Sequence, residues 1–251
     1  MKFVIAMVFG LTLLLQSVAH PQQKKGSLYG WVVVVDPGHG GADPGSSRIL
    51  RGERVTENEY VYDVSLRVQR LIRERQGLAL LTTKNGGGEQ NASPSKIVVD
   101  RRDERFALDG TLVRAGKSGL SKRVEFGNQV SRRYPKHRQA WISIHFDVVG
   151  SSSDVQGIRI ISADSSSRFV AALESTFRRV GRLREKHPVV ESGDDAHGIR
   201  NLYVLRSVNR IKDRVLIELG NFLNDDDLWR IRNPEVRELY AKEIASALER
   251  Y

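Results

Sequence analysis

Two histidines and one glutamate stand at positions where a folded chain could use them for hydrolytic chemistry. His39 follows the apolar run 32–35 in VVVVDPGHGG, His145 closes the run AWISIH, and Glu218 closes the run in DRVLIE. A carboxylate in apolar surroundings is costly unless it is paired or bound to a metal. Two histidines without cysteine need one more ligand, most naturally a carboxylate, because His₂Glu with water is an open catalytic zinc set. These residue types indicate metal-assisted hydrolysis.

The carboxylate ligand is expected from a helix that begins in the stretch TENE. Thr56 and Glu59 have the spacing of a capping box, in which Thr56 caps the helix and Glu59 reaches back. Glu57 lies in the first turn, four residues before Val61, so it shares the core-facing side of the helix and can point into a crevice. Glu53 is the rival carboxylate, but it lies in a loop with no element to fix its direction. We therefore predict that Glu57 is the ligand.

Each of these residues also has an ordinary structural interpretation. Asp36, three residues before His39, can hydrogen-bond its own backbone in a Pro-Gly turn. A histidine that ends an apolar strand, such as His145, is often a satisfied core group. Glu57 gains from the helix dipole as any first-turn acid does, and Glu218 can pair with one of the many arginines. The remaining histidines are weaker candidates: His20, His137, His187 and, best placed among them, His197.

Strands and helices alternate along the chain and predict how these residues come together. The expected strands cover 31–35, 78–83, 140–146, 157–163, 203–205 and 214–219. The expected helices cover 56–76, 123–134, 167–186 and the C-terminal segment that starts at Asn233-Pro234, a capping residue followed by proline. This order predicts a single α/β domain with a largely parallel mixed sheet flanked by helices. Ligands of such sheets bind outside the carboxyl ends of the strands, where the candidate residues converge.

One long segment inside this domain lacks periodicity. Residues 85–119 begin with Asn-Gly-Gly-Gly and contain one proline, several glycines and many charges. A loop of this length in a compact domain is usually functional or mobile, and we expect it to flank the cleft and control access. We assign residues 31–251 to one catalytic domain with this inserted loop, and residues 20–30 to a linker.

The first nineteen residues have the pattern of a secretory signal peptide. Lys2 is a short basic start, residues 3–15 are apolar, and Ser-Val-Ala at 17–19 offers the small residues of a cleavage site. An uncleaved anchor is the alternative, although the apolar run is short for a bilayer. We expect an exported protein, periplasmic in preference to a secreted or wall-associated one, with no stable membrane anchor after cleavage. The chain has no cysteine, so it has neither disulfides nor thiolate zinc ligands.

The charge balance suggests an anionic partner outside the cytoplasm. The 251 residues carry 40 Lys and Arg against 30 Asp and Glu, a formal net charge of +10. Surplus positive charge favours anionic surfaces and polymers. A recognition helix, an aromatic-studded basic strand and zinc-finger spacing are all missing from the sequence, so nucleic acid is not an expected partner. We also find no internal repeat and no appended wall-binding module, and we expect a monomer.

Four motifs, taken in order, resemble the zinc-dependent N-acetylmuramoyl-L-alanine amidases of the Amidase_3 type. VVVVDPGHGGADPG resembles the opening motif of that family, and ENEYVYDVSLRV resembles its Glu-led helix. SKRVEFGN followed by WISIHFD resembles its Arg-containing helix and its Ser-x-His strand, and RVLIELGNFLND resembles its final strand with the catalytic glutamate. The resemblance covers nearly all of the chain from residue 32 to about residue 247.

The resemblance implies a zinc amidase and exopeptidase-like fold and a role for each residue. Zinc would be held by His39, Glu57 and His145, and Glu218 would take and return the proton of the attacking water. The substrate would be peptidoglycan, and the bond would be the amide between N-acetylmuramic acid and the L-alanine of the peptide stem. Asp36 is expected to hold the second nitrogen of one ligand histidine. The glycines of the turn are expected to let the backbone approach the metal and substrate closely.

The sequence also departs from the family pattern. Phe146-Asp147 replaces the usual Ala-Asn, Gly220-Asn221-Phe222 replaces Gly-Phe, and the Thr-Arg after the second strand reads Thr82-Thr83-Lys84. These changes leave the expected metal set intact and affect substrate subsites. Two other functions stay open: a zinc carboxypeptidase that trims the peptide stem, and a wall-binding or regulatory protein that does not turn over substrate.

Overall fold

A computed structural model describes residues 25–50, 52–87, 91–146, 152–164, 167–179, 189–192 and 202–251. Six strands of these segments form one sheet in the order β4-β1-β7-β10-β8-β9. Their bounds are β1 (Trp31–Pro37), β4 (Leu78–Leu81), β7 (Arg138–His145), β8 (Arg159–Ser162), β9 (Val189–Ser192) and β10 (Asp213–Glu218). The strands β4, β1, β7 and β10 are parallel, whereas β8 runs antiparallel to β10. The predicted largely parallel mixed sheet is confirmed.

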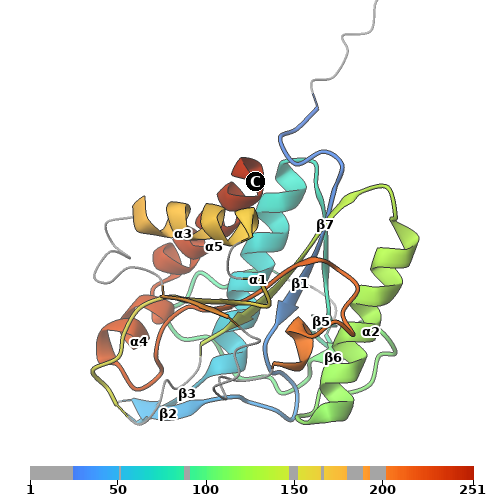
Figure 1. Cartoon of the computed structure of the whole chain (residues 1–251). Helices are drawn as coiled ribbons and strands as arrows, with labels where there is room; N and C mark the ends of the chain where they lie inside the picture. Colours follow the sequence, from blue (N-terminus) through green and yellow to red (C-terminus); the bar gives the residue numbers. More distant parts are fainter. Residues whose placement is uncertain are drawn as a thin grey trace, which may run out of the picture.

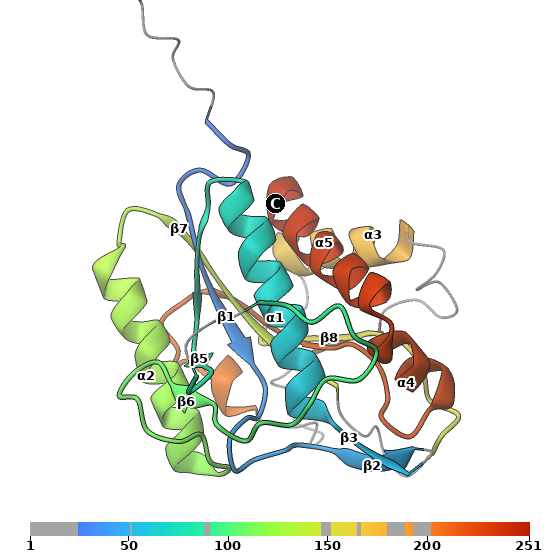
Figure 2. The same ribbon diagram turned by 180° about the vertical axis from the view of Figure 1, so that it is seen from behind.

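Helices cover both faces of the sheet. The helices α1 (Glu57–Glu74), α3 (Arg168–Arg179), α4 (Asp225–Arg232) and α5 (Pro234–Arg250) lie on one side, and α2 (Lys117–Arg133) lies on the other (Figures 1 and 2). The valine run of β1 is buried on both faces because successive side chains point in opposite directions. Val33 and Val35 join the core under α1 and α5, whereas Val32 and Val34 join the core under α2. This double burial holds the end of β1 rigidly.

Two short antiparallel strand pairs lie outside the main sheet. The strands β2 (Ser47–Leu50) and β3 (Glu53–Thr56) pair with each other and lead into α1, and β5 (Thr83–Lys84) pairs with β6 (Arg105–Phe106). The expected strand 78–83 is thus divided between β4 and β5. The 3-10 helix η2 (Tyr203–Leu205) replaces the strand expected at 203–205, because its backbone forms local bonds such as Arg206 N–H to Tyr203 O.

Helix α1 begins where predicted, but the predicted capping box is wrong. Thr56 has extended backbone angles and is the N-cap residue, yet its side chain accepts no cap hydrogen bond among the described residues. The carbonyl oxygen of Ser46 accepts from the Glu57 N–H, and that of Pro44 accepts from the Asn58 N–H. The preceding loop therefore satisfies the first donors of the helix. Asn233, in contrast, caps α5 as predicted, with its side chain accepting from the N–H of residue 235.

The first part of segment 85–119 is packed on the helices. Ser93 O accepts from the guanidinium groups of Arg67 on α1 and Arg237 on α5, and the Ser93 N–H donates to Asp63. Arg237 is completely buried and forms a 2.6 Å ion pair with Asp63. The segment around Ser93 therefore links α1 to α5 through hydrogen bonds. Helix α2 begins at Lys117, inside the range that the sequence analysis assigned to the loop.

The predicted signal segment 1–19 and residues 20–24 of the predicted linker lie outside the described residues. The rest of that linker, residues 25–30, is described, and its Leu28 is fully buried in the core and donates its N–H to Arg75 O at 3.0 Å. Within the part of the chain that the structure covers, none of the helices has both the length and the apolar character needed to cross a membrane.

Candidate metal centre

Three side chains from three elements meet at the carboxyl edge of the sheet. His39 follows β1, Glu57 opens α1, and His145 ends β7. His39 Nε2 lies 3.3 Å from Glu57 Oε1, and His145 Nδ1 lies 3.2 Å from the same oxygen. One ligand atom from each residue lies within 4.8 Å of the others, so the three residues could hold a metal ion. The structure brings together the three residues that the sequence analysis named as ligands.

Glu57 is held as an ionised carboxylate. Its side chain is fully buried, and it accepts hydrogen bonds from the Phe146 N–H at 2.9 Å and the Ser46 N–H at 3.0 Å. Burial alone would raise the pKa of Glu57, but the hydrogen bonds and charges of His145 and His39 hold that pKa well below its ordinary value. A deprotonated carboxylate between two imidazoles is the donor set that zinc prefers, so these residues fit a zinc ion.

The electrostatic surroundings of His39 favour a cation. Burial would lower the pKa of His39, but the neighbouring carboxylates of Asp43 and Glu57 raise it to about 10. Asp43 Oδ2 lies 3.1 Å from His39 Nδ1, on the ring nitrogen that does not face Glu57. The field that favours a proton on this imidazole also favours a divalent cation beside it.

Asp43 is the site residue that sequence reasoning missed. A two-residue turn places it, because Gly40 N–H donates to Asp43 O at 2.7 Å and Asp43 N–H donates to Gly40 O at 2.9 Å. The Gly45 N–H then donates to Asp43 Oδ1 at 3.3 Å. The i, i+4 spacing of histidine and aspartate in HGGAD was the available signal, but it becomes meaningful only with the tight turn between them.

The expected role of Asp36 at a histidine ring is wrong. Asp36 is 1 % exposed and accepts hydrogen bonds from Thr82 Oγ1 at 2.5 Å and Ser143 Oγ at 2.7 Å. It also forms a 2.7 Å ion pair with Arg123 of α2. The side chains of β1 alternate, so that of Asp36 projects toward α2 and joins β1, β7 and α2 rather than supporting an imidazole.

Arg123 also links this hydrogen-bond network to the turn that follows β1. Its guanidinium donates to Pro37 O at 2.5 Å and to His39 O. His39 has a φ of 64°, a left-handed conformation that is uncommon for a residue with a side chain. The buried ion pair therefore fixes the backbone that presents the imidazole.

Two glycines make room for the side chains of His39, Glu57 and His145. A Cβ atom on Gly38 would lie 2.4 Å from the Cε1 atom of His145. A Cβ atom on Gly45, which has a φ of 64°, would lie 2.6 Å from Glu57 Oε2 and 2.7 Å from His39 Cδ2. The glycines of the motif are thus needed where the rings and the carboxylate pass the backbone.

Glu218 lies at the same edge of the sheet. It is the last residue of β10, is 3 % exposed, and is the register partner of His145 on the parallel neighbour β7. Partnered residues on adjacent strands project to the same face of a sheet, so its carboxylate is on the side of the His145 ring. Its backbone is fixed there by the Leu219 N–H, which donates to His145 O at 2.9 Å.

The rival carboxylates lie elsewhere. Glu53 is half-exposed on β3 and lies 3.5 Å from Arg232. Glu59 turns away from the histidines and accepts from the Arg101 N–H at 3.1 Å. His137 is exposed and stacks edge-on against Tyr134. The other histidine candidates lie outside the described residues: His20, His187 and His197.

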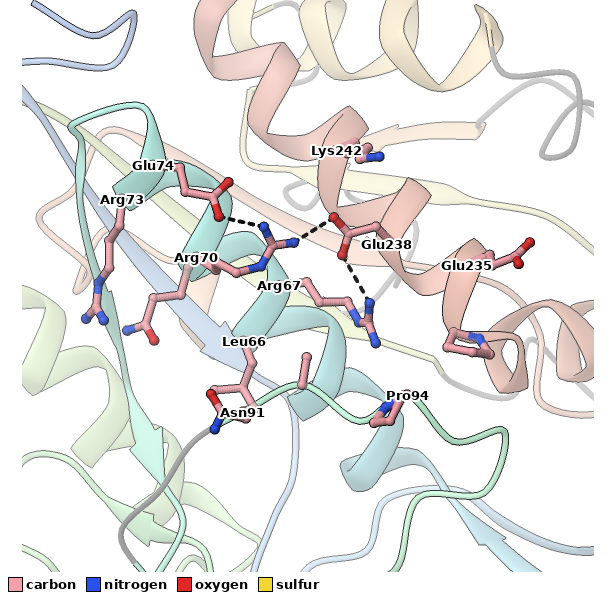
Figure 3. Close-up of a pocket in the computed structure, with 13 residues that line it drawn as sticks. Leu66, Arg67, Arg70, Arg73, Glu74, Asn91, Pro94, Glu235, Glu238 and Lys242 are labelled. Atoms are coloured by element: carbon pink, nitrogen blue, oxygen red, sulfur yellow. Dashed lines mark hydrogen bonds and ion pairs between the residues drawn. The ribbon is translucent and has the colours of Figure 1, made fainter.

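A groove of about 920 Å³ lies away from this site, between the later turns of α1, the start of α5 and residues 91–94 (Figure 3). Figure 3 shows Arg67 and Arg70 turned toward Glu238, and Arg70 also pairs with Glu74. Arg67, Arg70, Glu74 and Glu238 of this groove are thus engaged in ion pairs with one another. A smaller cavity of about 120 Å³ lies beside the two histidines of the metal centre.

Comparisons with known proteins agree with this arrangement. Residues 33–250 match the model of the Amidase_3 family, described as N-acetylmuramoyl-L-alanine amidase. An uncharacterized cell wall amidase of Bacillus anthracis is 25 % identical over 233 residues, which is 92 % of this chain and 37 % of the relative. The germination-specific N-acetylmuramoyl-L-alanine amidase of Bacillus subtilis is 22 % identical, with 89 % of this chain and 81 % of the relative covered. This chain thus spans little more than a third of the Bacillus anthracis relative.

Solved structures show the same fold. The AmiC2 amidase of Nostoc punctiforme superposes with a TM-score of 0.61 at 23 % identity, covering 91 % of this chain and 98 % of the other. The catalytic domain of the CwlV amidase from Bacillus (Paenibacillus) polymyxa var. colistinus gives a TM-score of 0.60 at 20 % identity, with 88 % and 97 % covered. The family model covers residues 33–250, a range that includes His39, Glu57 and His145. The chain therefore belongs to the Amidase_3 family of N-acetylmuramoyl-L-alanine amidases.

Proposed function

We propose that this chain hydrolyses the amide bond between the lactyl carboxyl group of N-acetylmuramic acid and the L-alanine of the peptide stem, with one zinc ion per chain. The observation that carries the proposal is the convergence of His39, Glu57 and His145 within 4.8 Å in a chain of an amidase family. Cell wall amidases among its relatives support peptidoglycan as the substrate.

Zinc would be held by His39 Nε2, His145 Nδ1 and Glu57 Oε1. Once bound, the ion would polarise the amide carbonyl and lower the pKa of a coordinated water toward about 7. Both histidines line the small cavity, which would admit the water and the amide to the ion. Asp43 would keep the proton of His39 on Nδ1, so that Nε2 is the free ligand atom.

Glu218 would act as the general base and then as the general acid. It would take the proton of the attacking water, and it would deliver a proton to the alanine nitrogen as the C–N bond breaks. The products would be a muramic acid carboxylate and a peptide with a free amino group. The burial of Glu218 and its register beside His145 support this role.

The placement of the protein in the cell follows from its N-terminal sequence. We infer that residues 1–19 direct export and are removed, that residues 20–30 link them to the fold, and that residues 31–251 act as one catalytic domain. The enzyme would then meet peptidoglycan in the periplasm or at the cell wall as a monomer without a membrane anchor. Cell wall amidases among its relatives support export.

Digestion of purified peptidoglycan followed by mass spectrometry tests the proposal. An amidase releases intact stem peptides and leaves glycan without peptide, and its activity should disappear with a chelator and return with Zn²⁺. Shortened stems that remain attached to glycan would instead indicate a carboxypeptidase. Intact peptidoglycan after prolonged digestion with the zinc-loaded protein would indicate a wall-binding protein, and full activity after rigorous chelation would overturn the metal assignment.

A further inference from the structure

The cavity beside the metal centre has a composition that suggests a substrate subsite. His39 and His145 line it together with Asp43 and Asp36, whose carboxylates are engaged by His39 and by Arg123. Its apolar wall consists of Leu120 of α2, Leu216 of β10, and the η2 region with Leu202, Tyr203 and Val204. The cavity therefore continues from the proposed reaction centre toward the α2 side of the sheet.

The size of the cavity limits what it can hold. Its volume of about 120 Å³ equals roughly four water molecules at about 30 Å³ each. Pockets that enclose a whole ligand of drug size measure about 300–1,000 Å³. The cavity is thus too small for a sugar ring with its substituents, and its apolar wall suits one small aliphatic group.

A cation stands at the rim of this cavity. Arg114 is exposed and lines the cavity, and the described residues offer its guanidinium no hydrogen-bond or ion-pair partner. The second guanidinium in the lining belongs to Arg123, which is engaged by Asp36 and by backbone carbonyls. Arg114 is therefore the cavity's uncommitted positive charge within the part of the chain that is described.

The backbone that carries Arg114 is anchored to the metal-site loop. The Ala42 N–H donates to Val113 O at 2.9 Å, and the Val113 N–H donates to Glu104 O at 2.9 Å. The Gly41 N–H donates to the Glu104 carboxylate at 2.5 Å. These bonds tie the segment before Arg114 to the turn that presents His39, so the backbone at Arg114 has a fixed position relative to the reaction centre.

The chemistry of the substrate indicates which half would meet this cation. The carboxyl group of muramic acid is consumed in the scissile amide, so the sugar half carries no charge there. The peptide half begins with the methyl group of alanine and continues with a glutamate joined through its side-chain carboxyl, whose α-carboxyl group is free or amidated. A small aliphatic group followed by an anion matches an apolar cavity with an arginine at its rim.

We propose that this cavity is the subsite for the peptide side of the scissile bond, with the alanine methyl group against the apolar wall and Arg114 binding the α-carboxylate of the next residue. The proposal rests on the amidase function proposed above. It implies that the enzyme distinguishes stems whose second residue has a free α-carboxylate from stems in which that group is amidated.

The test uses the full zinc-loaded chain and two soluble muramoyl tripeptides that differ only in a free or an amidated α-carboxyl group at the second residue. Wild type should cleave the free acid with a KM about tenfold lower than that of the amide. Arg114→Gln should raise the KM of the free acid about tenfold and leave kcat and the KM of the amide unchanged. Arg114→Lys should recover part of the difference.

Arg133→Gln is the matched control. Arg133 is also exposed, but it lies in the last turn of α2, just before β7 begins, whereas His145 lies at the far end of that strand. This control should behave as wild type on both substrates. Equal KM values of wild type for the two substrates, or an Arg114→Gln variant that changes both equally, would overturn the subsite assignment. Cleavage of neither substrate by wild type would instead overturn the proposed function.

Discussion

The carboxylate of Asp43 lies 3.1 Å from His39 Nδ1, and the other ring nitrogen, Nε2, lies 3.3 Å from Glu57. A carboxylate on the second nitrogen of a ligand histidine fixes its tautomer and orientation, and its loss typically costs about 10–100-fold in metal affinity or activity. We expect Asp43→Ala to weaken zinc binding by this factor, measured by competition with a chromophoric chelator. Asp109→Ala removes an exposed partner of Lys122 and should leave zinc affinity unchanged. Wild-type affinity in Asp43→Ala would contradict the role.

The buried position of Glu57 leads to a different expectation for each acid in the first turn of α1. Glu57→Gln should lose tightly bound zinc, because the remaining two imidazoles provide no anionic ligand. Glu59→Gln should retain one zinc per chain, because Glu59 is bonded to the Arg101 N–H and not to a histidine. Metal content after gel filtration, measured by atomic emission, checks both variants. Zinc retained by Glu57→Gln and lost by Glu59→Gln would reverse the assignment.

A substitution of Glu218 can distinguish a role in metal binding from a role in turnover. Glu218→Gln keeps the shape of the side chain but cannot accept the water proton, and positioned acid–base groups typically contribute about 10²–10⁴-fold. We expect zinc stoichiometry to stay at one per chain while the rate on a muramoyl peptide falls by at least about 100-fold. Loss of zinc together with activity would make Glu218 a ligand, and a near-normal rate would remove it from the mechanism.

The raised pKa of Glu59 predicts a pH dependence of the free energy of unfolding that is unrelated to turnover. Burial and the neighbouring charges of Glu104 and Asp100 raise the pKa of Glu59 from 4.5 to about 8. The folded state therefore holds a proton that the unfolded state has released over this interval, so stability falls as pH rises from about 4.5 to 8. One such proton contributes a slope of up to about 1.4 kcal/mol per pH unit. Urea unfolding of Glu59→Gln across this range should show a shallower loss, and an unchanged slope would contradict the assignment.

The ion pair between Asp63 of α1 and Arg237 of α5 should be the most sensitive polar contact of the helical layer. Arg237 is completely buried and Asp63 is 3 % exposed, so Asp63→Ala leaves an uncompensated buried charge. Such losses cost about 3–5 kcal/mol of unfolding free energy. Arg70→Ala breaks the ion pairs with Glu74 and Glu238, but Arg70 is 45 % exposed, so the loss should cost at most about 1 kcal/mol. Denaturant midpoints check the difference, and equal costs would contradict the argument.

The sheet and the convergence of His39, Glu57 and His145 could be predicted because they depend on local patterns. Four consecutive valines indicate a strand buried on both faces, and residues at the carboxyl ends of parallel strands converge whatever the loops do. The same reasoning failed for Asp36, since the side of the strand toward which it points is occupied by Arg123, which lies 87 residues away in sequence. A single sequence does not show which arginine will lie opposite a given acid.

Other departures have equally local causes. The predicted capping box at Thr56 and Glu59 was wrong because carbonyl groups of the loop at residues 44–46 accept hydrogen bonds from the first N–H groups of the helix. The spacing of residues within the helix does not reveal a contact with this loop. Helix α4 was missed, although Asn224 caps it through the N–H groups of residues 226 and 227 and three aspartates follow. A capping residue followed by acidic residues is typical of a helix start. The helix is only eight residues long, however, and its apolar residues do not recur at a clear helical spacing.

The three proposed ligands are far apart along the chain. His39 lies 18 residues before Glu57 in the sequence, and Glu57 lies 88 residues before His145. An ion bound to all three would act as a cross-link that closes two loops at once, one short and one spanning a third of the protein. Such a cross-link stabilises the native state by an amount that grows with the free metal concentration. The melting temperature of the protein should therefore report the zinc supply of its surroundings, and its lifetime would depend on metal availability as much as on packing.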